Sequence, residues 1–88
     1  DLRKRNIYIR DVNWIGDNEF KPTGSKKLKI KAKIRSSQEP KLASLFVSNK
    51  GLCVNFEEDV EGVSPGQACV FYDVNNSSRV LGGGWITQ

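Results

Sequence analysis

The sequence has no histidine, no methionine and only two cysteines among its 88 residues. Histidine is the commonest general base and the commonest zinc ligand, so its absence argues against a self-contained enzyme. No long apolar run is present, which excludes a transmembrane helix or a signal-peptide core, and we expect a cytoplasmic protein with no membrane partner. Because translated proteins begin with Met, a chain that starts at Asp1 is expected to be a piece of a longer protein.

Cysteine usage is too sparse for a disulfide-dependent secreted domain, which usually has four cysteines or more. Cys53 and Cys69 lie in the apolar segments LCVNF and ACVFY, and their spacing matches no CxxC redox or zinc pattern. This favours reduced thiols in the core, although a single bridge between neighbouring strands stays open. No evident base accompanies either residue in the sequence, so neither is marked as a nucleophile.

Charge is distributed unevenly along a chain that has 14 Lys and Arg residues against 10 Asp and Glu. Residues 1–50 contain 13 of the basic and 5 of the acidic residues, whereas residues 51–88 contain one Arg and 5 acidic residues. A basic half suggests an anionic partner, of which RNA is the commonest. A lysine-rich surface that is merely solvated is the alternative.

The pattern of apolar residues predicts strands, because no segment repeats them at helical spacing over three turns. One small all-β domain, residues 1–88, is therefore expected, curled into a closed or nearly closed antiparallel β-barrel of about six strands. Gly51, Pro65 and Gly66 suit tight turns, residues 57–62 and 75–78 are expected as loops, and Gly82–Gly84 as a bulge or sharp bend. The expected strands cover residues 6–12 (extended by 13–15), 27–35, 42–48, 52–56, 67–73 and 79–86.

The strand at residues 27–35, KLKIKAKIR, alternates strictly between apolar and basic side chains. One of its faces therefore belongs to the core, and the other presents Lys27, Lys29, Lys31, Lys33 and Arg35 to solvent or to a partner. Lysines give salt-sensitive contacts to phosphate, and the planar arginine fork can also stack on a base. The competing interpretation is an edge strand that lysines protect from aggregation.

Other candidate sites are weak. Gly82–Gly84 lies inside an expected strand and lacks the Lys-Ser/Thr and helix of a phosphate loop, and the acidic residues 57–61 lack the ligand spacing of a calcium loop. We therefore expect no metal site and no carboxylate pair for acid–base chemistry. Most aromatic residues fall in apolar strands and are expected in the core rather than in a base-stacking array. These are Tyr8, Trp14, Phe46, Phe56, Phe71, Tyr72 and Trp85.

Four segments in this order resemble one family, the C-terminal domain of the bacterial tRNA-specific 2-thiouridylases: DVNWI (11–15), KIR (33–35), VSPGQACVFYD (63–73) and VLGGGWI (80–86). The resemblance implies a full-length transferase with an N-terminal ATP-pyrophosphatase-type domain and a central domain before this barrel. It also implies that ATP activates the wobble uridine, position 34, and that a persulfide on a catalytic cysteine delivers the sulfur. Those residues belong to the missing domains, so this fragment is expected to be inactive alone and to bind no cofactor.

The same resemblance implies that the barrel holds the tRNA around its anticodon arm. By position, the RNA-contacting residues of the family correspond to Arg35, Ser36 and Gln67, and Ser36 replaces a tyrosine, so that any stacking there is lost. Lys29, Lys31 and Lys33 extend this set. Further expected partners are the enzyme's own N-terminal and central domains and a sulfur-relay donor protein. The alternative function is a structural or protein-docking barrel of a translation-related protein, without RNA contact.

Overall fold

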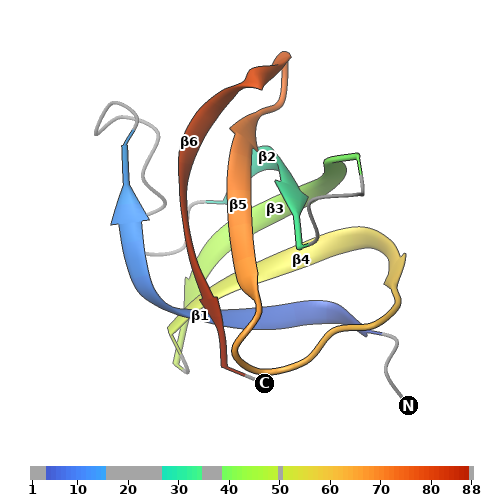
Figure 1. Ribbon diagram of the computed structural model, residues 1–88, viewed down its shortest axis with the longest axis vertical. Helices are drawn as coiled ribbons and strands as arrows, with labels where there is room; N and C mark the ends of the chain where they lie inside the picture. Colours follow the sequence, from blue (N-terminus) through green and yellow to red (C-terminus); the bar gives the residue numbers. More distant parts are fainter. Residues whose placement is uncertain (1–3, 16–26, 35–38, 50, 88) are drawn as a thin grey trace.

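The protein is a closed six-stranded antiparallel barrel, as predicted (Figure 1). The computed structural model describes residues 4–15, 27–34, 39–49 and 51–87. Around the barrel the strands follow the order β1-β4-β3-β2-β5-β6, with β6 closing onto β1. None of the described residues forms a helix, so none of them forms a helix that could cross a membrane. The strands are β1 (Lys4–Trp14), β2 (Leu28–Lys33), β3 (Lys41–Ser48), β4 (Gly51–Val60), β5 (Ala68–Asp73) and β6 (Asn76–Ile86).

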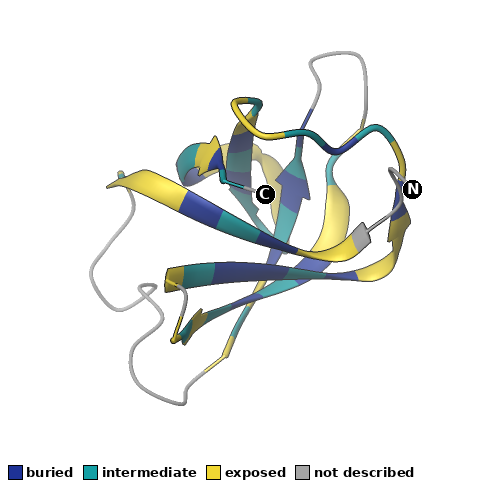
Figure 2. Cartoon of the chain, turned by 90° about the horizontal axis from the view of Figure 1, so that it is seen from below, coloured by how far each residue is buried: buried dark blue, intermediate teal, exposed yellow. Residues whose placement is uncertain are grey.

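Alternation of apolar and polar side chains builds the core, because successive residues of a strand point to opposite faces. In β2, Ile30 and Ala32 are buried, and Lys31 and Lys33, which alternate with them, are on the outside, as the sequence predicts. Every strand contributes buried residues to one apolar cluster inside the barrel (Figure 2). Phe56 and Phe71 are the largest of its fully buried side chains.

Two turns have the backbone expected of them. Gly51 has a φ of 110° and begins β4. It pairs with Ser48, the last residue of β3, across the β3–β4 hairpin. Between β4 and β5, the Gln67 N–H donates to the Ser64 carbonyl at 3.4 Å, and Gly66 has φ of 91°. A positive φ at the third position of a β-turn requires glycine, which explains the residue there.

Two expected loops were wrong. Residues 57–60 continue β4, because Val60 is buried and pairs with Lys4 of β1. The turn between β5 and β6 is shorter than residues 75–78, since Asn76 already pairs with Asp73. The Asp73 carboxylate stabilises this turn by accepting a hydrogen bond of 2.8 Å from the Asn75 N–H.

Gly82–Gly84 lies inside β6 and pairs with β5 in regular register. The register shifts lie next to the glycines, at Leu81 of β6 and between Arg10 and Asn13 of β1, so the expected bulge is found beside the glycine run. A Cβ atom at Gly83 would lie 2.5 Å from the Cys69 carbonyl oxygen of β5. One at Gly84 would lie 2.5 Å from the Ile9 side chain of β1. The absence of side chains therefore lets β6 run close to both neighbouring strands and close the barrel.

The prediction that most aromatic residues belong to the core was wrong. Phe56 and Phe71 are buried, and Trp14 packs against the core with its ring centroid 6.3 Å from that of Phe71. The other four aromatic side chains described come from alternating positions that face outward, since each is next to a buried residue of its strand. They are the half-buried Tyr8, Phe46 and Tyr72 and the exposed Trp85.

Candidate nucleic-acid interface

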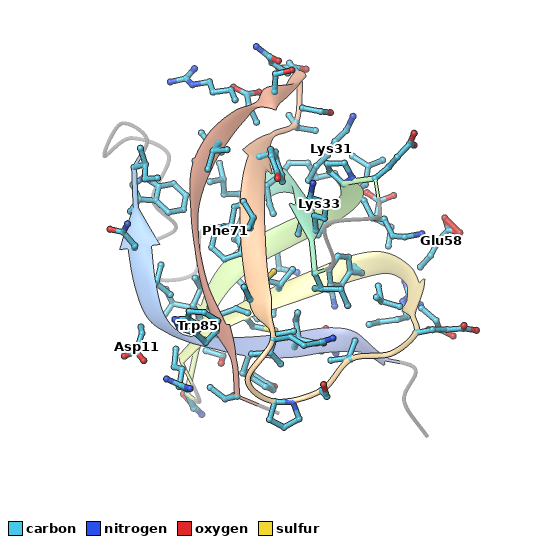
Figure 3. The ribbon with its side chains drawn as sticks, viewed as in Figure 1. Asp11, Lys31, Lys33, Glu58, Phe71 and Trp85 are labelled. Carbon is cyan, nitrogen blue, oxygen red and sulfur yellow. The ribbon has the colours of Figure 1, made fainter. Side chains whose placement is uncertain are left out.

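Three outward lysines of β2 have different partners on the neighbouring strands. Lys29 forms an ion pair with Glu57 of β4. The Lys31 ammonium donates to the Ser77 hydroxyl at 3.2 Å, and the Lys33 ammonium lies 5.5 Å from the centroid of the Tyr72 ring. Lys31 and Lys33 lie together along the outside of the barrel (Figure 3).

These partners decide which lysines present a net positive charge. The Glu57 carboxylate compensates the charge of Lys29, whereas Lys31 and Lys33 contact a hydroxyl group and an aromatic ring, both neutral. Among the described residues, no carboxylate lies within ion-pairing distance of Lys31 or Lys33. An uncompensated ammonium on an exposed face attracts a phosphate, and this attraction weakens as salt rises. Lys31 and Lys33 are therefore the stronger pair for binding an anion.

Gln67 lies at the start of β5, on the loop side of its turn. Its side-chain oxygen accepts a hydrogen bond of 3.0 Å from the Ser64 N–H, and its own carbonyl accepts one of 2.8 Å from the Ile86 N–H of β6. These two bonds fix both the backbone and the amide group. The amide NH₂ remains as a donor, which suits a ribose hydroxyl or a base edge.

The register of β2 and β5 brings this glutamine toward the lysines. Lys33 pairs with Val70, so the end of β2 and the beginning of β5 lie at the same end of this strand pair. Ile34, the last residue described before the predicted contacts Arg35 and Ser36, also lies there. Arg35 and Ser36 themselves are outside the described residues, and their role stays a prediction.

The sequence matches, over residues 4–86, the family described as "Aminomethyltransferase beta-barrel domain". The chain belongs to this barrel family. Its relatives include proteins named "tRNA-specific 2-thiouridylase MnmA" from Parvibaculum lavamentivorans, 47% identical over 87 residues, and from Afipia carboxidovorans, 46% identical over 88 residues. A third, from Bartonella henselae, is 43% identical over 91 residues.

These relatives confirm the resemblance drawn from the sequence motifs. The aligned region includes 99% of this chain in all three cases, but only 22% of each relative. The chain thus spans about a fifth of the length of the proteins that it resembles. A barrel-family member of this length corresponds to one domain of those proteins.

Both cysteines of this family member are free and buried. The bridge that the sequence left open is not formed, and β4 and β5, which contain them, are not neighbours in the barrel. Burial raises the pKa of the Cys69 thiol to about 12 and raises that of Cys53 as well. Both groups are therefore neutral thiols at neutral pH, unsuited to nucleophilic chemistry. Cys69 belongs to the core cluster, whereas Cys53 lies outside that cluster and is buried in register with Tyr8 of β1 and Phe46 of β3.

The remaining candidate chemistry is also structural. The described residues contain no group of three or more Cys, Asp or Glu side chains that could hold a metal ion. Gly82–Gly84 is paired on both sides within the barrel wall and forms no cradle for a phosphate. That this part of the chain binds no cofactor stays a prediction.

Sequence reasoning missed the aromatic side chains beside the lysines. Tyr72 follows the buried Phe71, and Trp85 precedes the buried Ile86. Because neighbours along a strand face opposite sides, only one residue of each pair can point into the core. The period-two pattern that located the lysines thus predicts one outward residue in each pair, but it does not tell which of the two that is.

Proposed function

We propose that this barrel is the tRNA-contacting, non-catalytic C-terminal domain of an enzyme that 2-thiolates the wobble uridine, position 34, of tRNA. The relatives named as tRNA-specific 2-thiouridylases support the enzyme class. The observation that carries the RNA contact is the uncompensated pair Lys31 and Lys33, at the same strand pair as Gln67. Lys29, Arg35 and Ser36 complete the proposed contact set, with Lys29 weakened by Glu57.

In this proposal the chemistry belongs to the domains that precede the barrel. An N-terminal ATP-pyrophosphatase-type domain would activate the uridine, a sulfur-relay protein would supply the persulfide sulfur, and the enzyme would work in the cytoplasm. The barrel would increase the affinity for the anticodon arm and orient it. The two buried neutral thiols and the lack of histidine support this division of roles.

A second candidate function is a protein-docking barrel without RNA contact. It draws on several apolar side chains that are exposed on the described surface. These include Val12, Ile15, Leu42, Val47 and Val80. The two functions differ in their expected response to salt, because apolar docking strengthens or changes little as salt rises, whereas phosphate binding weakens.

The test is to measure the affinity of the 88-residue chain for tRNA at several salt concentrations, with two matched variants. Lys33→Ala removes a lysine that lies over an aromatic ring at the Gln67 end of the strand pair. Lys27→Ala removes a lysine whose ammonium lies 5.3 Å from the centroid of the Phe46 ring. Lys27 is on the same side of the sheet as Lys33, about 20 Å from it along the strand. The two variants thus change net charge and ring contacts equally.

We expect Lys33→Ala to weaken tRNA binding and to lower the slope of log K against log salt by about 0.7–0.9, the value of one phosphate contact. Lys27→Ala should leave that slope nearly unchanged. Equal effects of the two variants would contradict the proposed site, and salt-independent binding would contradict the RNA function.

A further inference from the structure

An apolar groove adjoins the lysines on the outside of the barrel. Its position follows from the register, in which Lys33 of β2 pairs with Val70 of β5, and Val70 pairs with Gly83 of β6. In the next row, Ala68 pairs with Trp85. Lys33, Val70 and Trp85 consequently share one outer surface, with Trp85 on the other side of β5 from the lysine (Figure 3).

The groove exists because Gly83 places no side chain between its neighbours. It has a volume of about 300 Å³, with Gly83 and Gly84 in its floor and Val70, Val80 and Trp85 around them. A Cβ at residue 83 would lie 2.5 Å from the Cys69 carbonyl oxygen and 3.3 Å from the Val70 Cα, so backbone atoms surround this position. Trp85 is 45% exposed to solvent, which is unusual for a residue whose side chain has so much apolar area.

We infer that Trp85 stacks on an unpaired nucleobase of the RNA whose phosphates Lys31 and Lys33 contact. This inference rests on the proposed function and adds a residue to it. Aromatic side chains beside a positively charged track are the combination that binds single-stranded nucleic acid. β2 and β6 are two strand spacings apart, about 10 Å, so a phosphate at the lysines and a base at Trp85 belong to the same short stretch of RNA.

The surroundings of the groove favour a nucleotide over an apolar protein segment. Lys33 lies over Tyr72 on one side, and Arg10 pairs across the strands with Trp85 on the other. Arg10 also contacts Asp11, and both side chains of this ion pair are more than half exposed. The groove, whose lining includes Asp11, is therefore a narrow apolar strip with the uncompensated Lys33 on one side and the Arg10–Asp11 ion pair on the other. This arrangement suits a base with its phosphate on the lysine side better than it suits a continuous apolar surface.

The two tryptophans of the chain allow each to serve as the control of the other. Trp14→Phe leaves Trp85 as the only tryptophan, and Trp85→Phe leaves Trp14, which packs against Phe71. The probes are an RNA hairpin with the anticodon stem and loop, and a fully paired RNA duplex of equal length. Stacking on a base quenches tryptophan fluorescence, so the emission of each single-tryptophan protein is followed during titration.

We expect the hairpin to quench Trp85 and to leave Trp14 unchanged, and the duplex to quench neither. Trp85→Leu, which keeps apolar bulk without a ring, should weaken hairpin binding about tenfold, within the range measured for removal of one stacked base. Its affinity for the duplex should stay the same. Trp85→Phe, which keeps an aromatic ring, should lower the affinity for the hairpin only about threefold. Thermal unfolding of each variant verifies that the variant is folded.

The outcomes separate this inference from the proposed function. If the unmodified chain binds neither RNA at low salt, the proposed function fails and the inference with it. If it binds the hairpin in a salt-dependent manner and Trp85→Leu binds equally well, the inference alone is overturned, and the groove is left for a protein segment. Quenching of Trp85 by the duplex as strongly as by the hairpin would also overturn stacking on an unpaired base.

Discussion

The closure of the barrel at Gly83 predicts a large effect for the smallest possible substitution, Gly83→Ala. The new Cβ would lie 2.5 Å from the Cys69 carbonyl oxygen and 3.3 Å from the Val70 Cα, whereas ordinary contact begins at 3.4 Å. Both opposing atoms belong to the backbone of β5, so no side chain can rotate away. Relief requires β6 to move from β5, which weakens the pairs that join these strands.

We expect this substitution to lower the free energy of unfolding by about 3 kcal/mol, the upper part of the range for overpacking. A domain of this size has a free energy of unfolding of roughly 4–13 kcal/mol, so most of the variant should remain folded. The matched control is Gly66→Ala. A Cβ there meets nothing within 4 Å, but the φ of 91° disfavours a side chain, at a cost of about 1 kcal/mol.

The assay is urea unfolding of the three proteins, followed by circular dichroism. With a denaturant slope of about 1 kcal/mol/M, the two variants should differ in their midpoints by about 2 M. The difference isolates steric contact from backbone strain, since both variants add the same methyl group. A midpoint for Gly83→Ala as high as that for Gly66→Ala would refute the close approach of β6 to β5.

Two further predictions concern titration and charge. Because burial raises the pKa of Cys69 from 9.0 to about 12, its contribution to stability is complete below pH 9 and is lost as pH rises toward 12. At pH 10 the loss should be about 1.4 kcal/mol, and Cys69→Ala should remove that part of the pH dependence of urea unfolding. Glu57→Gln should change the free energy of unfolding by less than about 0.5 kcal/mol yet strengthen tRNA binding at low salt by releasing Lys29. Glu58→Gln, measured beside it, controls for net charge.

The control variants show which outcomes would contradict these two predictions. Stability that falls equally above pH 9 in Cys69→Ala would assign the pH dependence to other groups. Equal gains in tRNA affinity for Glu57→Gln and Glu58→Gln would mean that overall charge, and not the pairing of Lys29, limits the contact.

Local patterns explain why much of the fold could be predicted. The alternation of β2 is complete within the strand itself, so it locates Lys31 and Lys33 without knowledge of any neighbour. Gly51 and Gly66 lie at positions where the turn itself demands a positive φ. These features depend on a few adjacent residues, and the sequence contains all of them.

Features that depend on distant residues were missed. Three consecutive acidic residues indicated a loop, but Val60 beyond them is buried and pairs with Lys4, which extends β4. Lys29 resembled the other lysines of its strand until Glu57, 28 residues away, was found beside it. Trp85 looked like a core residue because the apolar run around it concealed which side faces outward. Strand pairing across the barrel decides each of these cases.

The most direct test of RNA contact by this barrel is a map of backbone amide shifts during titration with the anticodon arm of tRNA. We predict shifts clustered at residues 29–36, at Gln67 and at Trp85, which fade as salt rises. Residues of the β3–β4 hairpin around Ser48 and Gly51 should remain unchanged. No shifts at low salt, or shifts confined to the β3–β4 hairpin, would contradict RNA contact through these residues.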